Sequence, residues 1–522
     1  MIIRSSALLF PPGHDLEEQI RETAEIVNPA YLEHERMVGS GVRSRRAEKP
    51  PKYLQVWSLI PGGHRWAGGT LVPRCWGDGT LGRLIERDAF DHYADVEMPS
   101  PPFFAQGFEP RDYQLSAVDA VVADECGVVV MPCGAGKTST GVALIERLKR
   151  RTLILVHTKD LARQWVERIK GTAELAGQLE GVVVGTVGGG RKSTDEGADI
   201  VVAVMQTLRE WPWRDLYRWG EGFGLVIVDE CHRVPSETFM SVMSGLPSRY
   251  RVGLTATPER EDGMGALLWA AFGSVLFEVP RDELIARGAI RPARLFSHQT
   301  GSVIPTHEYQ HGPKSPWVAM TPGTDDFDKA RHLARNAKAA GLRHPKMRPR
   351  HYAAQVASLT TDAERNGLIV ELAAAKVGEG HSAIILSERV AHCRLLAKML
   401  RERGVAAEAV AGSQSQKQVS AILSAARRRE VRVLVGTTKA DEGLDVPVLS
   451  CGILATRTKK LGRLTQRIGR IERPEGMAPE WHDLVDAFPS AIKAWKQRQK
   501  LYAKLKLEGA TWKKGRKRGA AA

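Results

Sequence analysis

Residues 131–140 read MPCGAGKTST, and the rest of the chain is best interpreted outward from them. An apolar run at 128–130 precedes this stretch, and Val142, Ile145 and Leu148 follow it at helical spacing. A strand, a glycine turn, Gly-Lys-Thr and a helix together predict a phosphate-binding P-loop, whose backbone N–H groups and helix N-terminus face an anion. A plain glycine turn between a strand and a helix is the alternative.

Each residue type in this loop has an expected task. Lys137 would reach the β- and γ-phosphates, and the Thr138 hydroxyl would bind Mg²⁺. The pattern departs from the full motif at one place, because Met131 stands where the first glycine would be. The residues expected to hold the nucleotide here are Pro132, Cys133, Gly134, Ala135, Gly136, Lys137, Thr138 and Ser139.

The composition is that of a basic globular protein. The chain has 522 residues, 43% hydrophobic and 26% charged, which predicts three or four domains. The net charge of +15 favours a nucleic-acid or anionic membrane partner. Residues 493–518 hold eleven Lys or Arg against one acid, Glu508, so the excess gathers near the C-terminus.

The six cysteines are scattered, without a Cys-x-x-Cys pair, which argues against zinc and against a disulfide framework. No apolar run approaches about 18 residues, so no membrane span or membrane partner is expected. We therefore expect a cytoplasmic protein, associated with the nucleoid, or located in the host cytoplasm if a phage encodes it.

The chain divides into five expected parts. Residues 1–100 predict a small accessory α+β module with a possible DNA contact, including a helix at 16–27, a basic loop at 41–52, and strands at 53–60 and 69–73. Residues 101–290 and 376–490 alternate strands and helices, which predicts the α/β class, with two parallel sheets covered by helices on both faces. Between these blocks, 291–375 is expected to be a basic linker or insertion, and 491–522 a basic helical tail.

The alternating blocks set the expected strands. In the first block they lie at 128–131, 153–156, 182–187, 200–204, 225–228, 251–254 and 275–279. In the second block they lie at 383–386, 406–410, 431–435, 452–455 and 483–485. The linker contains a basic run at 331–351, for which a solvated face and a nucleic-acid contact are both open.

Residues 225–232, LVIVDECH, are the second informative stretch. A buried strand ends in two acids, of which Asp229 could hold Mg²⁺ and Glu230 could orient the attacking water. Ligands of parallel sheets bind beyond the carboxyl ends of the strands, where the P-loop, Asp229 and Thr255 all fall. The acid pair and the P-loop therefore predict one site.

This combination resembles the DExH-box helicases and translocases of superfamily 2, here with Asp-Glu-Cys-His at 229–232. The resemblance implies two tandem RecA-like domains. It also implies that Arg111 and Gln114 form an adenine-reading Q motif, for which glutamine geometry is suited. Thr255 and Thr257 would link the state of the ATP site to domain movement, and His232, with Gln466, would couple the γ-phosphate to the nucleic-acid track.

Further motifs extend the resemblance. Residues 158–165 and 205–208 are similar to the strand-contacting motifs Ia and Ib, and 440–447 and 466–473 are similar to motifs V and VI. The residues that this implies for nucleic-acid contact are Thr158, Gln206, Thr207, Arg260 and Thr437. Those that it implies for the nucleotide, from the second block, are Gly443, Asp445, Gln466, Arg470 and Arg473.

In such enzymes the arginines matching Arg470 and Arg473 reach the γ-phosphate across a cleft between the two domains. A guanidinium there stabilises the charge that spreads over the γ-phosphoryl oxygens in the transition state. Alternatively, Arg467, Arg470 and Arg473, spaced by three residues, could form one solvated helix face.

Residues 260–262, Arg-Glu-Asp, and the Pro-Cys-Gly-Ala-Gly-Lys loop resemble the XPB group, with the phage UvsW-like helicases as near neighbours. Pro258 departs from the XPB pattern, which has an aliphatic residue there. The resemblance implies a monomeric ATP- and Mg²⁺-dependent DNA helicase or translocase that moves 3′ to 5′. Its substrate would be single-stranded, duplex or branched DNA, and its settings repair, recombination or replication. An RNA helicase and an ATP-gated nucleic-acid clamp or annealing module remain as alternatives.

Overall fold

The computed structural model describes most residues between 93 and 509 and seven short strands before them. The described ranges are 2–4, 7–10, 25–27, 53–55, 58–59, 70–73, 89–91, 93–172, 176–188, 195–233, 236–256, 266–302, 304–313, 315–322, 324–412, 414–437, 446–458, 461–473 and 476–509. The chain divides into two compact units, Met1–Glu283 and Leu284–Ala522, and each is described by itself. Within the described residues, no helix is long and apolar enough to cross a membrane.

Short strands open the first unit. Five form a sheet in the order β5-β6-β2-β1-β7, and β3 pairs with β4. Their bounds are β1 (Ile2–Arg4), β2 (Ala7–Phe10), β3 (Glu25–Val27), β4 (Tyr53–Gln55), β5 (Ser58–Leu59), β6 (Thr70–Pro73) and β7 (Ala89–Asp91). The end of the expected helix at 16–27 is therefore the strand β3, where the β-branched Ile26 and Val27 suit a strand. Residues 16–24 and the basic loop 41–52 lie outside the described residues.

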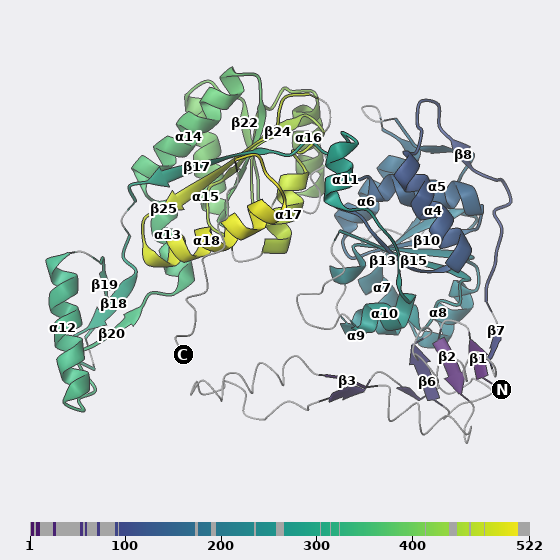
Figure 1. Ribbon diagram of the computed structural model, residues 1–522, viewed down its shortest axis with the longest axis horizontal. Helices are drawn as coiled ribbons and strands as arrows, with labels where there is room; N and C mark the ends of the chain where they lie inside the picture. The colour runs from purple at the N-terminus through teal and green to yellow at the C-terminus, as the bar shows by residue number, and fades with distance from the viewer. Residues whose placement is uncertain are drawn as a thin grey trace, which may run out of the picture. The chain divides into compact units, whose positions relative to one another are not determined.

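A seven-stranded parallel sheet is the frame of the first unit (Figure 1). Its order is β12-β13-β10-β14-β15-β9-β16. The strands are β9 (Cys126–Val130), β10 (Thr152–Val156), β12 (Val184–Val187), β13 (Ile200–Val204), β14 (Leu225–Asp229), β15 (Tyr250–Thr255) and β16 (Val275–Glu278). All seven expected strands are present, and none of their ends is displaced by more than two residues. A separate pair joins β8 (Phe103–Phe104) to β11 (Leu179–Glu180).

Helices cover both faces of this sheet (Figure 1). They are α4 (Asp112–Asp124), α5 (Lys137–Leu148), α6 (Lys159–Lys170), α7 (Met205–Arg209), α8 (Trp213–Gly220), α9 (Ser236–Met243) and α10 (Ala266–Phe272), with a 3-10 turn, η1 (Cys231–Arg233). Val128 and Val130 share a core with α7–α10, and the pleat turns Val129 to the opposite face, which α4–α6 cover. Burial on both faces explains why the inner strands, such as β10 and β13, are continuous apolar runs.

The carboxyl edge of this sheet brings the expected site residues together. Strands β9, β15, β14, β10 and β13 are consecutive neighbours, about 4.8 Å apart. The P-loop follows β9, and Thr255 and Asp229 end β15 and β14. Thr158 follows β10, and Gln206 follows β13. Expected nucleotide-binding residues therefore occupy one part of the edge and expected strand-contacting residues the next.

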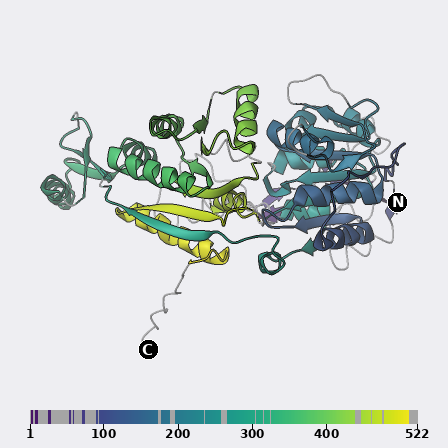
Figure 2. The same ribbon diagram turned by 90° about the horizontal axis from the view of Figure 1, so that it is seen from above.

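The second unit is built on a six-stranded parallel sheet in the order β17-β25-β24-β21-β23-β22. Its strands are β17 (Arg294–Thr300), β21 (Ser382–Leu386), β22 (Ala407–Val410), β23 (Val433–Gly436), β24 (Leu449–Leu454) and β25 (Glu480–Asp486). Its helices, with α11 at the junction, are α11 (Arg281–Ala286), α13 (Tyr352–Thr360), α14 (Ala363–Gly378), α15 (Val390–Glu402), α16 (Gln416–Arg427), α17 (Leu461–Gly469) and α18 (Pro489–Lys504). Figure 2 shows α18, in yellow, on one face of the sheet and green helices on the other, in agreement with the two separate cores.

The second block begins earlier than the sequence indicated. The segment 291–375 was expected to be a linker or insertion, but β17 lies within it and pairs in parallel with β25, from Arg294 opposite Glu480 to Thr300 opposite Asp486. The helix α14 also packs on this sheet. The strand β17 lies at the edge of the sheet, and nearly all of its residues are exposed or partly exposed. Its sequence RLFSHQT therefore lacks the apolar run of the inner strands.

A small ββαβ element projects between β17 and α13 (Figure 1). Its strands β18 (His307–Gln310), β19 (Val318–Met320) and β20 (Lys346–Pro349) form an antiparallel sheet in the order β19-β18-β20. The helix α12 (Asp325–Ala339) packs on one face, where the Phe327 ring meets the His307 ring edge-to-face at 5.3 Å. The basic run 331–351 therefore belongs to a folded insertion.

Candidate active site

The P-loop connects β9 to α5. Gly134 and Gly136 have positive φ angles, 87° and 83°, which L residues other than glycine rarely adopt. At Gly136 a Cβ would also lie 2.4 Å from the Nε2 atom of Gln114. Met131, by contrast, is fully buried, and its N–H donates to the Thr255 carbonyl. This position continues the sheet, so the first glycine of the usual motif is not needed here.

The ammonium group of Lys137 lies against the acid pair. Its Nζ atom is 3.5 Å from the Glu230 Oε1 atom. Burial alone would lower the pKa of Lys137, but the negative charge nearby, chiefly that of Glu230, raises it above its ordinary value. The lysine is therefore held as a cation at the first turn of α5, where a phosphate would meet it.

Asp229 ends β14 with its side chain 5% exposed. Its Oδ1 atom accepts a hydrogen bond from the Glu230 N–H at 3.0 Å, and its Oδ2 atom accepts one from the Trp165 Nε1–H at 2.8 Å. Burial, and then the charge of Glu230, raise the pKa of Asp229 to about 6, although Trp165 and Lys137 lower it. The two carboxylates thus concentrate negative charge that a divalent cation would neutralise.

Glu230 has a φ angle of +48°, in the left-handed region that residues with a Cβ rarely occupy. The turn carries its carboxylate back toward Lys137 on one side and His232 on the other. His232 Nδ1 is 3.5 Å from Glu230 Oε2 and 2.7 Å from the Thr255 hydroxyl. His232 therefore lies between the acid pair and the end of β15, close to Glu230 and hydrogen-bonded to Thr255.

The Q-motif residues bond to the P-loop itself. Gln114 donates from Nε2 to the carbonyls of Ala135 and Gly136, at 3.0 and 3.4 Å, and accepts from the Arg111 N–H through Oε1. The Tyr113 hydroxyl donates to the Ala135 carbonyl at 2.9 Å. These bonds place Arg111 and Gln114 at the loop, and adenine recognition by them stays a prediction.

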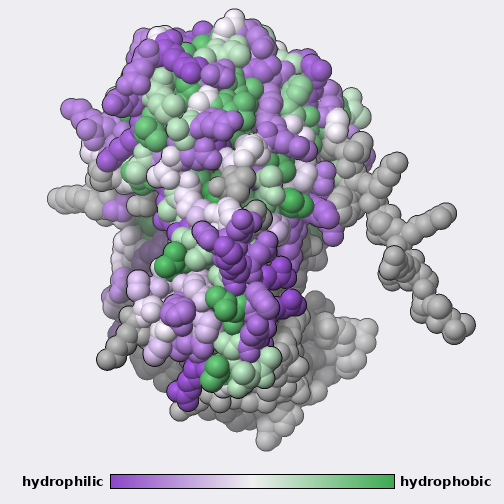
Figure 3. Space-filling view, turned by 90° about the vertical axis from the view of Figure 1, so that its left-hand side faces the viewer, coloured by the Kyte–Doolittle hydropathy of each residue, from purple (hydrophilic) through white to green (hydrophobic). Residues whose placement is uncertain are grey.

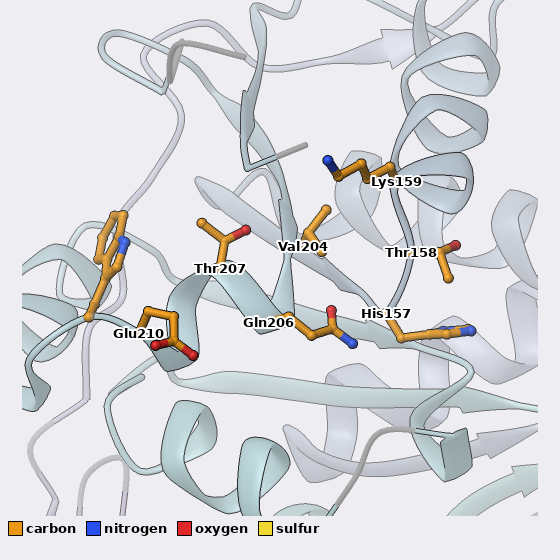
Figure 4. Close-up of a pocket in the computed structure, with 8 residues that line it drawn as sticks. His157, Thr158, Lys159, Val204, Gln206, Thr207 and Glu210 are labelled. Atoms are coloured by element: carbon orange, nitrogen blue, oxygen red, sulfur yellow. The ribbon is translucent and has the colours of Figure 1, made fainter. Parts of the chain in front are cut away.

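Three of the expected strand-contacting residues, Thr158, Gln206 and Thr207, line a pocket at the ends of β10 and β13, with a volume of about 600 Å³ (Figure 4). Thr158 caps α6, its hydroxyl accepting from the Leu161 N–H, and Gln206 and Thr207 lie on α7. Thr437 follows β23 in the second unit and is buried. Arg260 and Thr257 lie outside the described residues.

Motif VI lies in the second unit, on and just after α17. Gln466 is on the helix, which ends at Gly469, and Arg470 and Arg473 follow it. Arg467 is buried, and the helix stops before Arg470, so the three arginines do not form one solvated helix face. Gly443 and Asp445 lie outside the described residues.

Two contacts of this site were not expected from the sequence. Trp165 belongs to the segment expected to touch a strand, yet it is 1% exposed and bonds to Asp229. Its ring also packs closely on α5, where a Cβ at Gly141 would lie 2.6 Å from it. Gln178 donates to the Ser139 hydroxyl at 3.0 Å. In each of these two pairs the residues are far apart in sequence. One signal was present in the sequence, the helical spacing of Trp165 and Ile169, which indicates that the tryptophan is buried.

Trp165→Phe should weaken binding of Mg²⁺-nucleotide about 10- to 100-fold, because groups that orient a metal ligand have effects of this size. The indole N–H would no longer fix the Asp229 carboxylate. The measurement is the affinity for a fluorescent nucleotide, determined once in Mg²⁺ and once in EDTA. The loss of affinity should appear in Mg²⁺ and not in EDTA.

The matched control is Trp219→Phe, which removes another indole-to-aspartate hydrogen bond of the same unit, Trp219 to Asp195 at 2.7 Å. It should leave both affinities unchanged. An equal loss in EDTA for Trp165→Phe would mean that the indole supports the loop as a whole and not the carboxylate.

Comparison with known families gives two matches along the chain. Residues 107–260 match the family "Type III restriction enzyme, res subunit", and residues 364–475 match "Helicase conserved C-terminal domain".

Two curated relatives are similar over most of the chain. The DNA 3'-5' translocase XPB2 of Sulfurisphaera tokodaii is 28% identical over 71% of this chain and 80% of its own length. The DNA 3'-5' helicase XPB of Mycobacterium tuberculosis is 28% identical over 73% of this chain, but the match spans only 61% of that protein.

Among solved structures, Saccharomyces cerevisiae Dbp5 bound to RNA and ADP BeF3 superposes with a TM-score of 0.52 and 14% identity, over 77% of this chain and 89% of Dbp5. At this identity the likeness concerns the fold, which is the two-domain RecA-like α/β architecture.

Proposed function

The chain belongs to the superfamily 2 helicases related to XPB, and from that premise we propose that it is an ATP-dependent DNA helicase or translocase. The observation that carries the proposal is the approach of Lys137 to Glu230, 3.5 Å apart, where the P-loop and the acid pair meet on one sheet edge. A phosphate-binding cation beside a water-orienting carboxylate is what ATP hydrolysis requires.

In this proposal Lys137 and the loop backbone bind the phosphates of ATP, and Glu230 orients the attacking water. Asp229 and Thr138 hold Mg²⁺, since both supply the oxygen ligands that this cation prefers. The raised pKa of Asp229 fits such a role, because a buried carboxylate beside a second one is stabilised by added positive charge. Bound Mg²⁺ would neutralise charge on the phosphates.

The second unit completes the site in the proposed mechanism. Arg470 and Arg473 act as arginine fingers, and Gln466 and His232 connect the γ-phosphate to the nucleic-acid site. ATP then holds the two units together, and hydrolysis releases them, which is the hinge type of switch. Thr257, Arg260, Gly443 and Asp445 keep the roles that the family resemblance implies.

The proposed substrate is DNA, with movement 3′ to 5′, because the names of the relatives specify that polarity on DNA. The proposed setting is DNA repair, with recombination and replication as further settings. ATPase rates with single-stranded, duplex and forked DNA and with RNA test this. DNA should stimulate most, and strand separation on a fork should follow. RNA stimulation alone would identify an RNA helicase, stimulation without separation would favour a translocase or clamp, and no stimulation would exclude a motor.

The basic face of α12 should strengthen DNA binding without base preference. Arg331, Arg335 and Lys338 are exposed at helical spacing on this helix, C-terminal to the acids of its first turn. Figure 3, which views the side where α12 lies in Figure 1, shows hydrophilic residues predominating over that region. Changing all three to alanine should weaken binding equally for different sequences. It should also make the slope of log K against log salt concentration shallower by about two for single-stranded DNA, since three phosphate contacts are lost.

A control for this triple variant is alanine at Lys398, Arg401 and Arg403. These residues are also exposed basic side chains of the second unit, but each is ion-paired with a glutamate. The control removes the same charge and should leave the salt slope unchanged. Equal slopes for the two triple variants would show that α12 acts only through net charge.

A further inference from the structure

The pocket at the ends of β10 and β13 has features that backbone binding alone does not explain. Its volume of about 600 Å³ lies within the range of small-molecule sites, roughly 300–1,000 Å³. Besides the expected strand-contacting residues, Lys159, Glu210 and Trp211 line it. A carboxylate repels a phosphate and an indole offers a flat ring, so these two side chains suit another part of a nucleotide.

One end of the pocket suits a phosphate. The exposed Lys159 is the first residue of α6, which is 12 residues long and presents its positive end here. The Thr207 hydroxyl also faces this region (Figure 4). Figure 4 places Lys159 and Glu210 at opposite ends of the group of side chains.

The other end suits a base. Trp211 is half-buried on the core, with its ring against Trp219 at a centroid distance of 5.2 Å and an interplanar angle of 69°. Trp219 is in turn fixed by its hydrogen bond to Asp195 and its contact with Phe223. A ring held in this way and lining a pocket is a stacking surface for a base.

Glu210 determines the orientation in which a nucleotide can bind in the pocket. Its carboxylate is exposed and only accepts hydrogen bonds, so it repels a phosphate and attracts the donor groups of a base. The phosphate therefore lies at Lys159 and the base at Trp211. Guanine fits best, since its pairing edge offers two adjacent donors, N1–H and the N2 amine, and thymine offers one.

Resting on the proposed function, we propose that this pocket holds one unstacked nucleotide of the bound DNA strand and prefers guanine. Trp211 stacks on the base, Glu210 accepts from its two donors, and Lys159 binds the adjacent phosphate. The strand is then read at one position, in addition to the sequence-independent grip on its backbone.

The test is binding of single-stranded oligonucleotides of about 20 nucleotides, longer than the roughly 4–16 nucleotides that an OB fold, another fold that binds single strands, covers. We would compare all-thymine DNA with alternating thymine–guanine and thymine–hypoxanthine DNA, because hypoxanthine lacks only the N2 amine. The full-length protein should bind the guanine strand roughly tenfold more tightly than the hypoxanthine strand, the range of a two-hydrogen-bond base contact.

Two variants separate the two interactions. Glu210→Gln should abolish most of the tenfold difference in affinity between the guanine and hypoxanthine strands, because the carboxylate that accepts from both guanine donors is gone. Trp211→Ala should weaken binding of all three strands about tenfold, and Trp211→Phe should restore most of it because a ring remains. Glu221→Gln, an exposed glutamate at the end of α8, is the matched control and should change nothing.

The outcomes distinguish this proposal from the one it rests on. The nucleotide-pocket proposal would be wrong if all three strands bound tightly and equally, stimulated the ATPase equally, and were unaffected by Glu210→Gln. That result would leave the proposed helicase or translocase function unchanged. No binding and no stimulation by any strand would overturn both. Loss of binding by Trp211→Ala with a lowered unfolding temperature and no rescue by phenylalanine would assign Trp211 to the core and contradict the stacking role.

Discussion

Glu230→Gln is expected to lower ATP turnover by at least about 100-fold while ATP still binds. Glutamine keeps the shape of the side chain but cannot accept a proton from the attacking water, and general bases contribute roughly 10²- to 10⁴-fold. The unusual backbone of Glu230, with φ at +48°, and its contacts with Lys137 and His232 hold the carboxylate in one place. The measurements are the single-turnover rate of phosphate release and the affinity for a fluorescent ATP analogue.

The control for this variant is Glu180→Gln, an exposed glutamate of the same unit that lies on β11. It should hydrolyse ATP at the normal rate. If Glu230→Gln retained hydrolysis, another group would orient the water, and the assignment of the acid pair would be wrong.

Arg470→Ala should produce the second large loss, about 1,000-fold or more in kcat, with ATP binding changed by less than about tenfold. An arginine finger acts on the charge of the transition state, where it is worth roughly 10³- to 10⁵-fold, and contributes little to ground-state binding. Arg470→Lys should recover little, since an ammonium group does not reproduce the two-pronged contact of a guanidinium with phosphate oxygens.

Arg463→Ala is the matched control, because Arg463 lies on α17 in the same segment and has no expected role. Its kcat should match that of the unchanged protein. Equal kcat values for the Arg463 and Arg470 variants would remove Arg470 from the proposed mechanism.

The sequence predicted the first sheet well because its five inner strands are buried on both faces. Burial on two sides requires a continuous apolar run, and such runs are visible without any knowledge of the partners. The same reasoning missed β17, because at its edge position nearly all of its residues are exposed or partly exposed and no apolar run marks it. It also missed β3, whose three residues are too few to mark a strand.

The P-loop and the acid pair were also readable, since their chemistry depends on residue types at fixed spacing. Glycine is needed where φ is positive, as at Gly134 and Gly136, and this requirement is local. The replacement of the first glycine by Met131 became understandable only when the structure showed that this residue continues the sheet.

What the sequence by itself determined is therefore the α/β class, the strands with two-sided burial, and the residue types of the phosphate and acid motifs. Only the tertiary structure decided which distant residues come together. Trp165 bonds to Asp229 and Gln178 bonds to Ser139, and Trp211 lines the same pocket as the start of α6. The physical reason is that local motifs reflect backbone conformation and periodic burial, which neighbouring residues set. Contacts between segments depend on strand order, which places β10 between β14 and β13 and leaves no periodic trace in the chain.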